Sequence, residues 1–172
     1  MAGGPTRRAV LVASAAAVPV LLSACRGMQA LGTPPTPPLD VRQLRAAIEA
    51  EQLMIARYRA AISAASGGLA SYSTVSRLTG ILADHRQHLV QLSARLVVPA
   101  GSSPPRARGA RAPLPSGLAA AIRALETAEQ DASTRLAGLL LDAPPSLAQL
   151  LASISASEAT HAAALASLRR TP

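Results

Sequence analysis

Four stretches of the chain repeat hydrophobic residues at steps of three and four positions, the spacing of one buried face of an α-helix. Strand-like alternation does not compete with this pattern anywhere along the chain. The pattern predicts an all-α fold, a four-helix bundle. The helices are expected to run from N-caps at Asp40, Ser73, Ser116 and Ser146 to about residues 66, 98, 141 and 170.

Each hydrophobic stripe is interrupted near its middle by ionisable residues. An unpaired ionised group inside a protein costs several kcal/mol, so these positions are unusual. Each interruption lies about 11 to 13 residues after the predicted cap of its helix, roughly 16–20 Å along the axis. Helix midpoints coincide in a bundle, and the polar side chains are therefore expected to converge. They are Glu51, His85, Glu129, and Glu158 with His161.

The connections favour one topology. The first two helices and the last two are joined by short loops, which predict two antiparallel hairpins. Residues 99–116 are longer and contain five prolines. At about 3.3 Å per residue they reach roughly 60 Å, enough to cross the bundle so that the second and third helices run parallel. A disordered basic loop is the alternative for this segment.

These residues resemble the ferritin-like superfamily, in particular its small exported bacterial members of unknown function. Glu158-Ala-Thr-His161 matches the fourth-helix motif, and Glu126-Thr-Ala-Glu129 is similar to the third. Glu51 followed by Tyr58 resembles the first-helix pattern. The second helix departs from the family, because Asp84-His85-Arg86-Gln87-His88 carries His85 where the motif has a glutamate.

The resemblance implies a metal site that uses imidazole and carboxylate ligands, with iron, manganese or zinc as the candidate ions. Three further residues, Tyr58, Asp84 and Glu126, are expected to contact the ligands from outside. The alternative is a metal-free core in which the carboxylates pair with protonated imidazoles. The candidate ligands are Glu51, His85, His88, Glu129, Glu158 and His161.

The N-terminal region reads as a bacterial export signal. Residues 1–24 have a short basic start and a small, apolar segment, followed by Leu22-Ser23-Ala24-Cys25, which matches the lipobox of bacterial lipoproteins. The resemblance implies a lipid on Cys25 and anchorage to the outer face of the cell membrane. Arg7-Arg8 leaves twin-arginine and general secretory export both open. Residues 25–39 are expected to form a Pro-rich tether and residues 40–170 the ferritin-like domain.

Composition narrows the function classes. The formal net charge is +8 and aromatic residues make up 1% of the chain, so base-stacking nucleic-acid recognition is not expected. Cys25 is the only cysteine, which excludes a thiolate metal site and a disulfide framework. Membrane lipid, a second copy of the chain and another envelope protein are the expected partners. Two functions stay open: metal handling or oxidoreductase chemistry, and a non-enzymatic structural or interaction lipoprotein.

Overall fold

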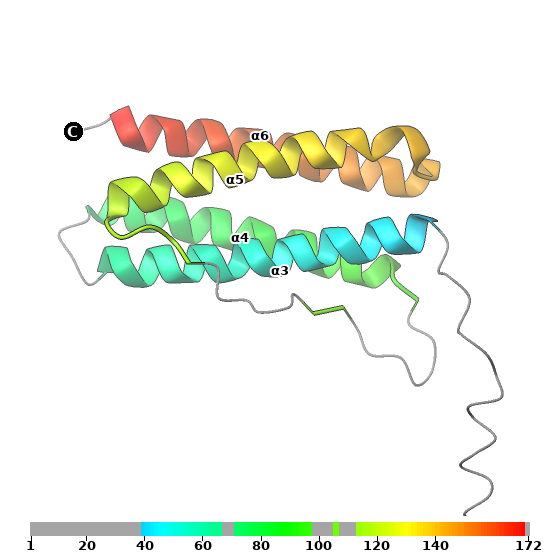
Figure 1. Cartoon of the computed structure of the whole chain (residues 1–172), viewed down its shortest axis with the longest axis horizontal. Coiled ribbons are helices and arrows are strands. Elements are labelled where there is room, and N and C mark those ends of the chain that lie inside the picture. The colour runs from blue at the N-terminus through cyan, green and yellow to red at the C-terminus, as the bar shows by residue number, and fades with distance from the viewer. Residues whose placement is uncertain (1–38, 67–70, 98–104, 107–112, 171–172) are drawn as a thin grey trace, which may run out of the picture. The chain divides into compact units, whose positions relative to one another are not determined.

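The computed structural model describes residues 39–66, 71–97, 105–106 and 113–170. Within these ranges the chain forms four α-helices, one short 3₁₀ turn and no strand, which confirms the predicted all-α fold. The predicted signal, Cys25 and the tether up to residue 38 lie outside the described residues. In chain order (Figure 1) the elements are α3 (Leu39–Ser66), α4 (Tyr72–Arg95), α5 (Leu118–Gly138), η2 (Leu140–Asp142) and α6 (Pro145–Arg170).

The helices pair as two antiparallel hairpins, α3 with α4 and α5 with α6 (Figure 1). Two hydrophobic clusters fix their relative directions. One cluster combines the second half of α3, the first halves of α4 and α5, and the second half of α6. The other cluster combines the opposite halves of the same helices. Helices α4 and α5 therefore run parallel, as the long connection predicts.

The two clusters occupy the two ends of the bundle and leave its middle to polar side chains. Leu78, Leu125 and Leu165 are fully buried at one end, and Leu92 and Leu151 at the other. Each fully buried leucine side chain contributes roughly 1.5–3 kcal/mol, so these end clusters supply the stability that a polar middle layer lacks. The buried stripe predicted from the sequence is confirmed along all four helices.

The connection between α4 and α5 is described at residues 105–106. There the carbonyl oxygen of the buried Pro105 accepts a 3.0 Å hydrogen bond from Nε2 of Gln52, near the middle of α3. This contact places part of the connection beside the hairpin that it leaves.

Two helices begin at other residues than predicted, because Ser71 caps one of them and Pro145 begins the other. Helix α4 is capped by Ser71, whose Oγ accepts a hydrogen bond from the Thr74 N–H at 3.3 Å, so the cap is two residues before the predicted Ser73. Helix α6 begins at Pro145, a favoured first position because proline lacks the N–H that would be unpaired there. Ser146 lies inside the first turn, and the predicted cap at Ser146 is wrong.

The remaining ends shift by a few residues. Helix α3 already includes Leu39, which places Asp40 in the first turn, where a carboxylate complements the helix dipole. Gly117 replaces the predicted Ser116 as the cap of α5, at a positive φ of 88° that favours glycine. Helix α5 ends at Gly138 rather than near residue 141, and η2 follows it.

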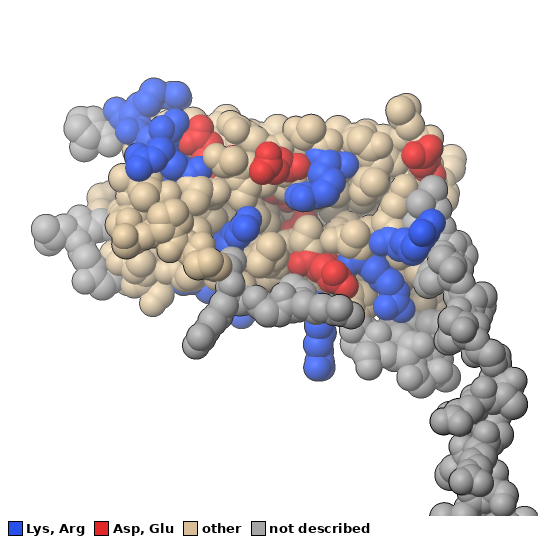
Figure 2. Space-filling view, in the orientation of Figure 1, with Lys and Arg blue, Asp and Glu red and all other residues tan. Residues whose placement is uncertain are grey.

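The surface carries both signs of charge. Figure 2 shows arginine and acidic side chains interspersed over the face that α3 and α5 form. None of the described helices combines the length and the apolar character that crossing a membrane requires.

Candidate metal centre

Each helix delivers ionisable side chains to the same central layer, between the two hydrophobic clusters. All six predicted ligands are buried, with exposed fractions between 0% and 8%. On α4 and on α6 the two ligands are three residues apart, so both face the bundle axis from adjacent turns. The structure brings together Glu51 from α3, His85 and His88 from α4, Glu129 from α5, and Glu158 and His161 from α6.

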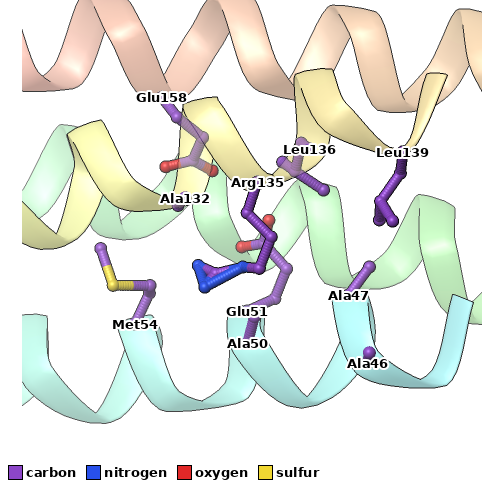
Figure 3. A pocket seen from close by; sticks show the side chains of 10 residues that line it. All are labelled: Ala46, Ala47, Ala50, Glu51, Met54, Ala132, Arg135, Leu136, Leu139 and Glu158. Atoms are coloured by element: carbon purple, nitrogen blue, oxygen red, sulfur yellow. The ribbon is translucent and has the colours of Figure 1, made fainter. Parts of the chain in front are cut away.

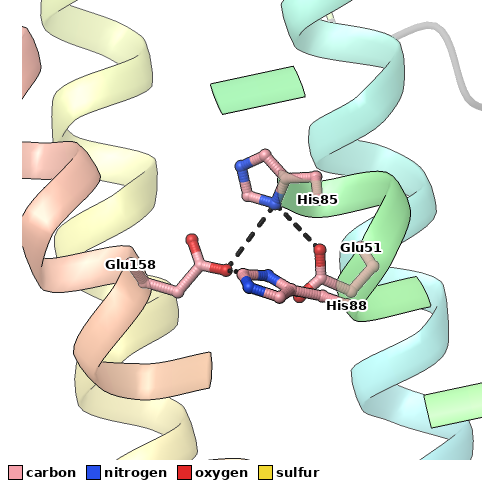
Figure 4. A group of neighbouring side chains, drawn as sticks. All are labelled: Glu51, His85, His88 and Glu158. Atoms are coloured by element: carbon pink, nitrogen blue, oxygen red, sulfur yellow. Dashed lines mark hydrogen bonds and ion pairs between the residues drawn. The ribbon is translucent and has the colours of Figure 1, made fainter. Parts of the chain in front are cut away.

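The six side chains form two overlapping groups of four. The first group consists of Glu51, His85, His88 and Glu158 (Figure 4). In it, Nδ1 of His88 lies 3.5 Å from Oε1 of Glu51 and 3.4 Å from Oε1 of Glu158. Three donor atoms thus surround one point on the α3–α4 side of the layer. We call this the first half-site.

The second group consists of His85, Glu129, Glu158 and His161. Nδ1 of His161 lies 3.7 Å from Oε2 of Glu129 and 3.8 Å from Oε2 of Glu158. These three atoms form the second half-site, on the α5–α6 side. Glu158 presents one carboxylate oxygen to each half-site and therefore links them.

His85 lies between the two halves, where the family motif has a glutamate. Its Nδ1 is 2.8 Å from Oε2 of Glu51, and its Nε2 is 3.0 Å from Oε1 of Glu129. The fully buried imidazole therefore spans two carboxylates that come from different hairpins. A glutamate at this position would bring a fourth negative charge, whereas His85 brings hydrogen-bond donors.

Two of the three expected outer residues contact the ligands. The Tyr58 hydroxyl donates a hydrogen bond to Oε1 of Glu129, inside the core. Oδ2 of Asp84 lies 3.2 Å from Nε2 of His161. When that Nε2–H donates to Asp84, the lone pair of Nδ1 faces Glu129 and Glu158, the orientation that a metal-ligating histidine requires.

Glu126 is not part of this arrangement, and its predicted contact with the ligands is wrong. It lies one helical turn before Glu129 and forms an ion pair with Arg169 near the end of α6, at 2.7 Å. Sequence reasoning also missed Ser157, whose Oγ is 3.3 Å from Nε2 of His161. Their four-residue spacing on a helix was the signal that could have identified it.

Burial and close opposite charges set the protonation of the cluster. Burial alone would raise the pKa of the carboxyls, but the close imidazole of His161 and the hydrogen bond with His85 hold the pKa of Glu129 far below its usual range. The same balance, with His85 and His88 as partners, lowers the pKa of Glu51. For Glu158, burial outweighs its histidine partners and the nearby Glu129 adds to it, so its pKa is raised.

Burial alone would lower the pKa values of the three imidazoles, but all three are raised. Hydrogen bonds to Glu129 and Glu51 raise the pKa of His85 to about 10. Contacts with Glu158 and Glu51 raise the pKa of His88 to about 9. Contacts of His161 with Glu129 and Glu158 raise its pKa to about 9. Without a metal, three imidazolium groups therefore face three carboxyl groups at neutral pH.

The hydrogen bonding of the ligand atoms also fits a bound metal ion. Four buried ligand atoms have no hydrogen-bond partner among the described residues, and all four belong to the two half-sites. Buried polar atoms are normally hydrogen-bonded, whereas these four face oppositely charged groups at ion-pair distances of 3.4 to 3.8 Å and can serve as metal ligands. Two ligand atoms at a tetrahedral zinc with bonds of about 2.0–2.1 Å lie roughly 3.4 Å apart, close to the spacings here. The atoms are His88 Nδ1, His161 Nδ1, Glu129 Oε2 and Glu158 Oε2.

Comparison with known families agrees with the all-α fold. A model of the family described as ferritin-like domain matches residues 39–171. The chain therefore belongs to the ferritin-like family, and the resemblance of its sequence to the ferritin-like superfamily is confirmed. No curated protein and no solved structure matches the chain.

Proposed function

We propose that this protein binds one or two divalent metal ions in the central layer of its bundle and serves in metal handling or oxidoreductase chemistry. The observation that carries the proposal is the set of four unpartnered ligand atoms in a fully buried layer. Glu51, His88 and Glu158 would hold an ion in the first half-site, and Glu129, His161 and Glu158 in the second. Imidazole and carboxylate ligands suit zinc, iron and manganese.

Such ions supply Lewis acidity, and iron or manganese also supplies redox chemistry. The surrounding residues prepare the ligands for that role. Asp84 fixes which imidazole nitrogen of His161 faces the layer, and Tyr58 holds one oxygen of Glu129. The leucine clusters close both ends of the layer to water and strengthen its electrostatic interactions.

A second function is favoured by a different observation. His85 bonds to carboxylates of both hairpins, and the raised imidazole pKa values let three cations balance the three acidic groups. The layer would then be a metal-free polar network that fixes helix register, in a lipoprotein that binds another envelope protein.

Metal content separates the two functions. The protein should be purified from its native host, and its zinc, iron and manganese measured together with the melting temperature before and after chelation. We expect at least one ion per chain and a lower melting temperature after chelation, because a ligand that binds only the folded state stabilises it. If the native protein contains no metal, and added zinc, iron and manganese do not change its melting temperature, the structural function is favoured.

We further propose that the chain is a lipoprotein, anchored through Cys25 to the outer face of the bacterial cell membrane. Support comes from Leu22-Ser23-Ala24-Cys25 after a short apolar segment. Cys25→Ala should release the protein from the membrane fraction or block its processing, as fractionation and mass spectrometry of the N-terminus would show. A Cys25→Ala protein that is cleaved normally and stays in the membrane would refute the anchor.

A further inference from the structure

A narrow cavity leads from the surface into the first half-site. It lies between α3 and α5, at the seam where the two hairpins meet, and its volume is about 40 Å³. A water molecule needs roughly 10–15 Å³ in such a cavity, so this one holds a ligand of only a few atoms. Most of its wall is apolar, and alanines on both helices, among them Ala47, Ala50 and Ala132, leave the space open. We call this cavity the α3–α5 slot.

The inner end of the α3–α5 slot consists of two candidate ligands, Glu51 and Glu158 (Figure 3). Glu158 is 1% exposed, and its Oε1 belongs to the first half-site, 3.4 Å from Nδ1 of His88. A small molecule in the slot would therefore lie against the ligands of a bound ion. The opposite face of the centre differs, because there a wide, open groove of about 740 Å³ between α4 and α6 reaches Asp84 and His161.

Arg135 is the cation that lines the α3–α5 slot, and it is exposed at the surface. Figure 3 shows its side chain extending from α5 toward α3, in front of Glu51. Within the described ranges the one arginine–carboxylate ion pair joins Arg169 and Glu126, which leaves Arg135 without an acidic partner there. Its charge is thus available to a ligand that enters the slot.

We propose that the α3–α5 slot admits a small monovalent anion of a few atoms to the first half-site, and that Arg135 selects it by charge. This inference rests on the proposed metal function. When both half-sites are occupied, two divalent ions bring four positive charges, of which the three central carboxylates cancel three, so the fully loaded centre also favours an anion. The slot limits size, since a larger organic anion does not fit the alanine-lined space.

Two probes of similar size and different charge test the selection. Azide binding to the cobalt(II)-loaded protein, followed by visible absorbance, reports an anion. Nitric oxide binding to the iron(II)-loaded protein without oxygen reports an uncharged molecule. We expect Arg135→Ala to slow azide binding about tenfold at low salt and to remove most of its salt dependence, because a lost charge reduces electrostatic steering. Nitric oxide binding should be unchanged.

Variants of the same helix control for size and for general charge. Ala132→Leu fills the α3–α5 slot and should slow both probes, whereas Ala137→Leu, on an exposed face of α5, should slow neither. Arg123→Ala removes an exposed α5 arginine that does not line the slot and should leave azide binding unchanged. Cobalt affinity is measured for every variant, so a damaged metal site is recognised.

The outcomes separate this inference from the proposed function. Unchanged azide binding in Arg135→Ala, or an equal effect on both probes, would overturn charge selection while metal binding stands. Unchanged rates in Ala132→Leu would overturn the slot as the route. Failure of the wild-type protein to bind cobalt and iron would overturn the proposed function, and this inference with it.

Discussion

The two hairpins contribute unequal halves to one centre. Helices α5 and α6 supply Glu129, Glu158 and His161, two carboxylates and an imidazole whose other nitrogen is held by Asp84. Helices α3 and α4 supply a single carboxylate and two imidazoles, and their half-site is completed by an oxygen of Glu158 from α6. Each half-site thus combines one imidazole nitrogen with two carboxylate oxygens, but in the second half-site Asp84 also holds the other nitrogen of the imidazole. We therefore expect the second half-site to bind a divalent ion more tightly than the first.

His85 is the reason that the α3–α4 hairpin supplies one carboxylate fewer than the α5–α6 hairpin, and exchanging it for a glutamate should have the largest effect. In the metal-free state, His85→Glu replaces a buried partner of Glu51 and Glu129 with a fourth carboxyl group. We expect it to destabilise that state by roughly 3–5 kcal/mol, measured by denaturant unfolding after chelation. In the presence of metal, the added carboxylate should raise the stoichiometry toward two ions per chain.

His85→Gln is the matched control for this exchange, because it removes the imidazole without adding a charge. It should lower the metal-free stability and leave the stoichiometry unimproved. If His85→Glu binds no more metal than His85→Gln, the missing carboxylate does not limit the number of ions that the centre binds.

Glu158 serves both halves, so its removal together with His161 should abolish metal binding. An ion present at 100 times its dissociation constant stabilises the folded state by about 2.7 kcal/mol. Glu158→Ala with His161→Ala should lose all of that increment, and added zinc, iron or manganese should no longer raise the melting temperature. Glu126→Ala is the control, because Glu126 pairs with Arg169 outside the centre. A metal-dependent melting temperature that survives the double substitution would place the ions elsewhere.

Much of this arrangement follows from periodicity alone. The common depth of Glu51, His85, Glu129 and Glu158 on four hydrophobic stripes predicted their convergence, since helices of matched length align their midpoints in a bundle. The length of residues 99–116 predicted parallel α4 and α5, because that segment can cross the bundle. Both inferences use one-dimensional spacing, which a regular helix converts directly into position.

Other features depend on contacts that spacing does not encode. Asp84 lies about 100° away from the stripe on α4, yet its carboxylate reaches His161 at the edge of the layer because the groove between α4 and α6 is open. Glu126 has the spacing of a family motif, but an arginine close to the C-terminus of α6 takes it as a partner. Helix starts were displaced because Ser71 and Pro145 meet the backbone requirements better than the residues predicted.

The contact between Asp84 and His161 makes the second half-site the better oriented one. Asp84→Asn keeps the shape of the side chain and removes its charge. We expect metal affinity to fall about 10–100-fold, the usual cost of losing a partner that orients a ligating histidine. Competition with a chelator of known affinity measures the change. Asp131→Asn, an exposed α5 residue, is the charge-matched control, and an equal loss in both variants would mean that surface charge rather than orientation is responsible.

The stability of the folded protein should change with pH in opposite directions with and without metal. The change per pH unit should be smaller than the effects of the substitutions above. In the metal-free state the folded pKa values of His85, His88 and His161, about 9 to 10, exceed the unfolded value of about 6.5. Their contribution is complete below pH 6.5 and is lost as the pH rises through 9 to 10. Metal binding requires neutral imidazoles and releases protons, so metal affinity should rise over the same interval.

Melting temperatures of the chelated and the metal-loaded protein between pH 6 and pH 9 would measure both trends. We expect the two curves to diverge as the pH increases, because the chelated protein loses stability while the metal gains affinity. Glu51 and Glu129 cannot produce this divergence, since their lowered pKa values affect stability only below about pH 4.5, whereas the raised pKa of Glu158 acts in the same sense as the imidazoles. His88→Gln removes one of the three raised imidazoles and should flatten the chelated curve. Parallel curves in the wild-type protein would mean that the imidazoles do not lose protons to the metal.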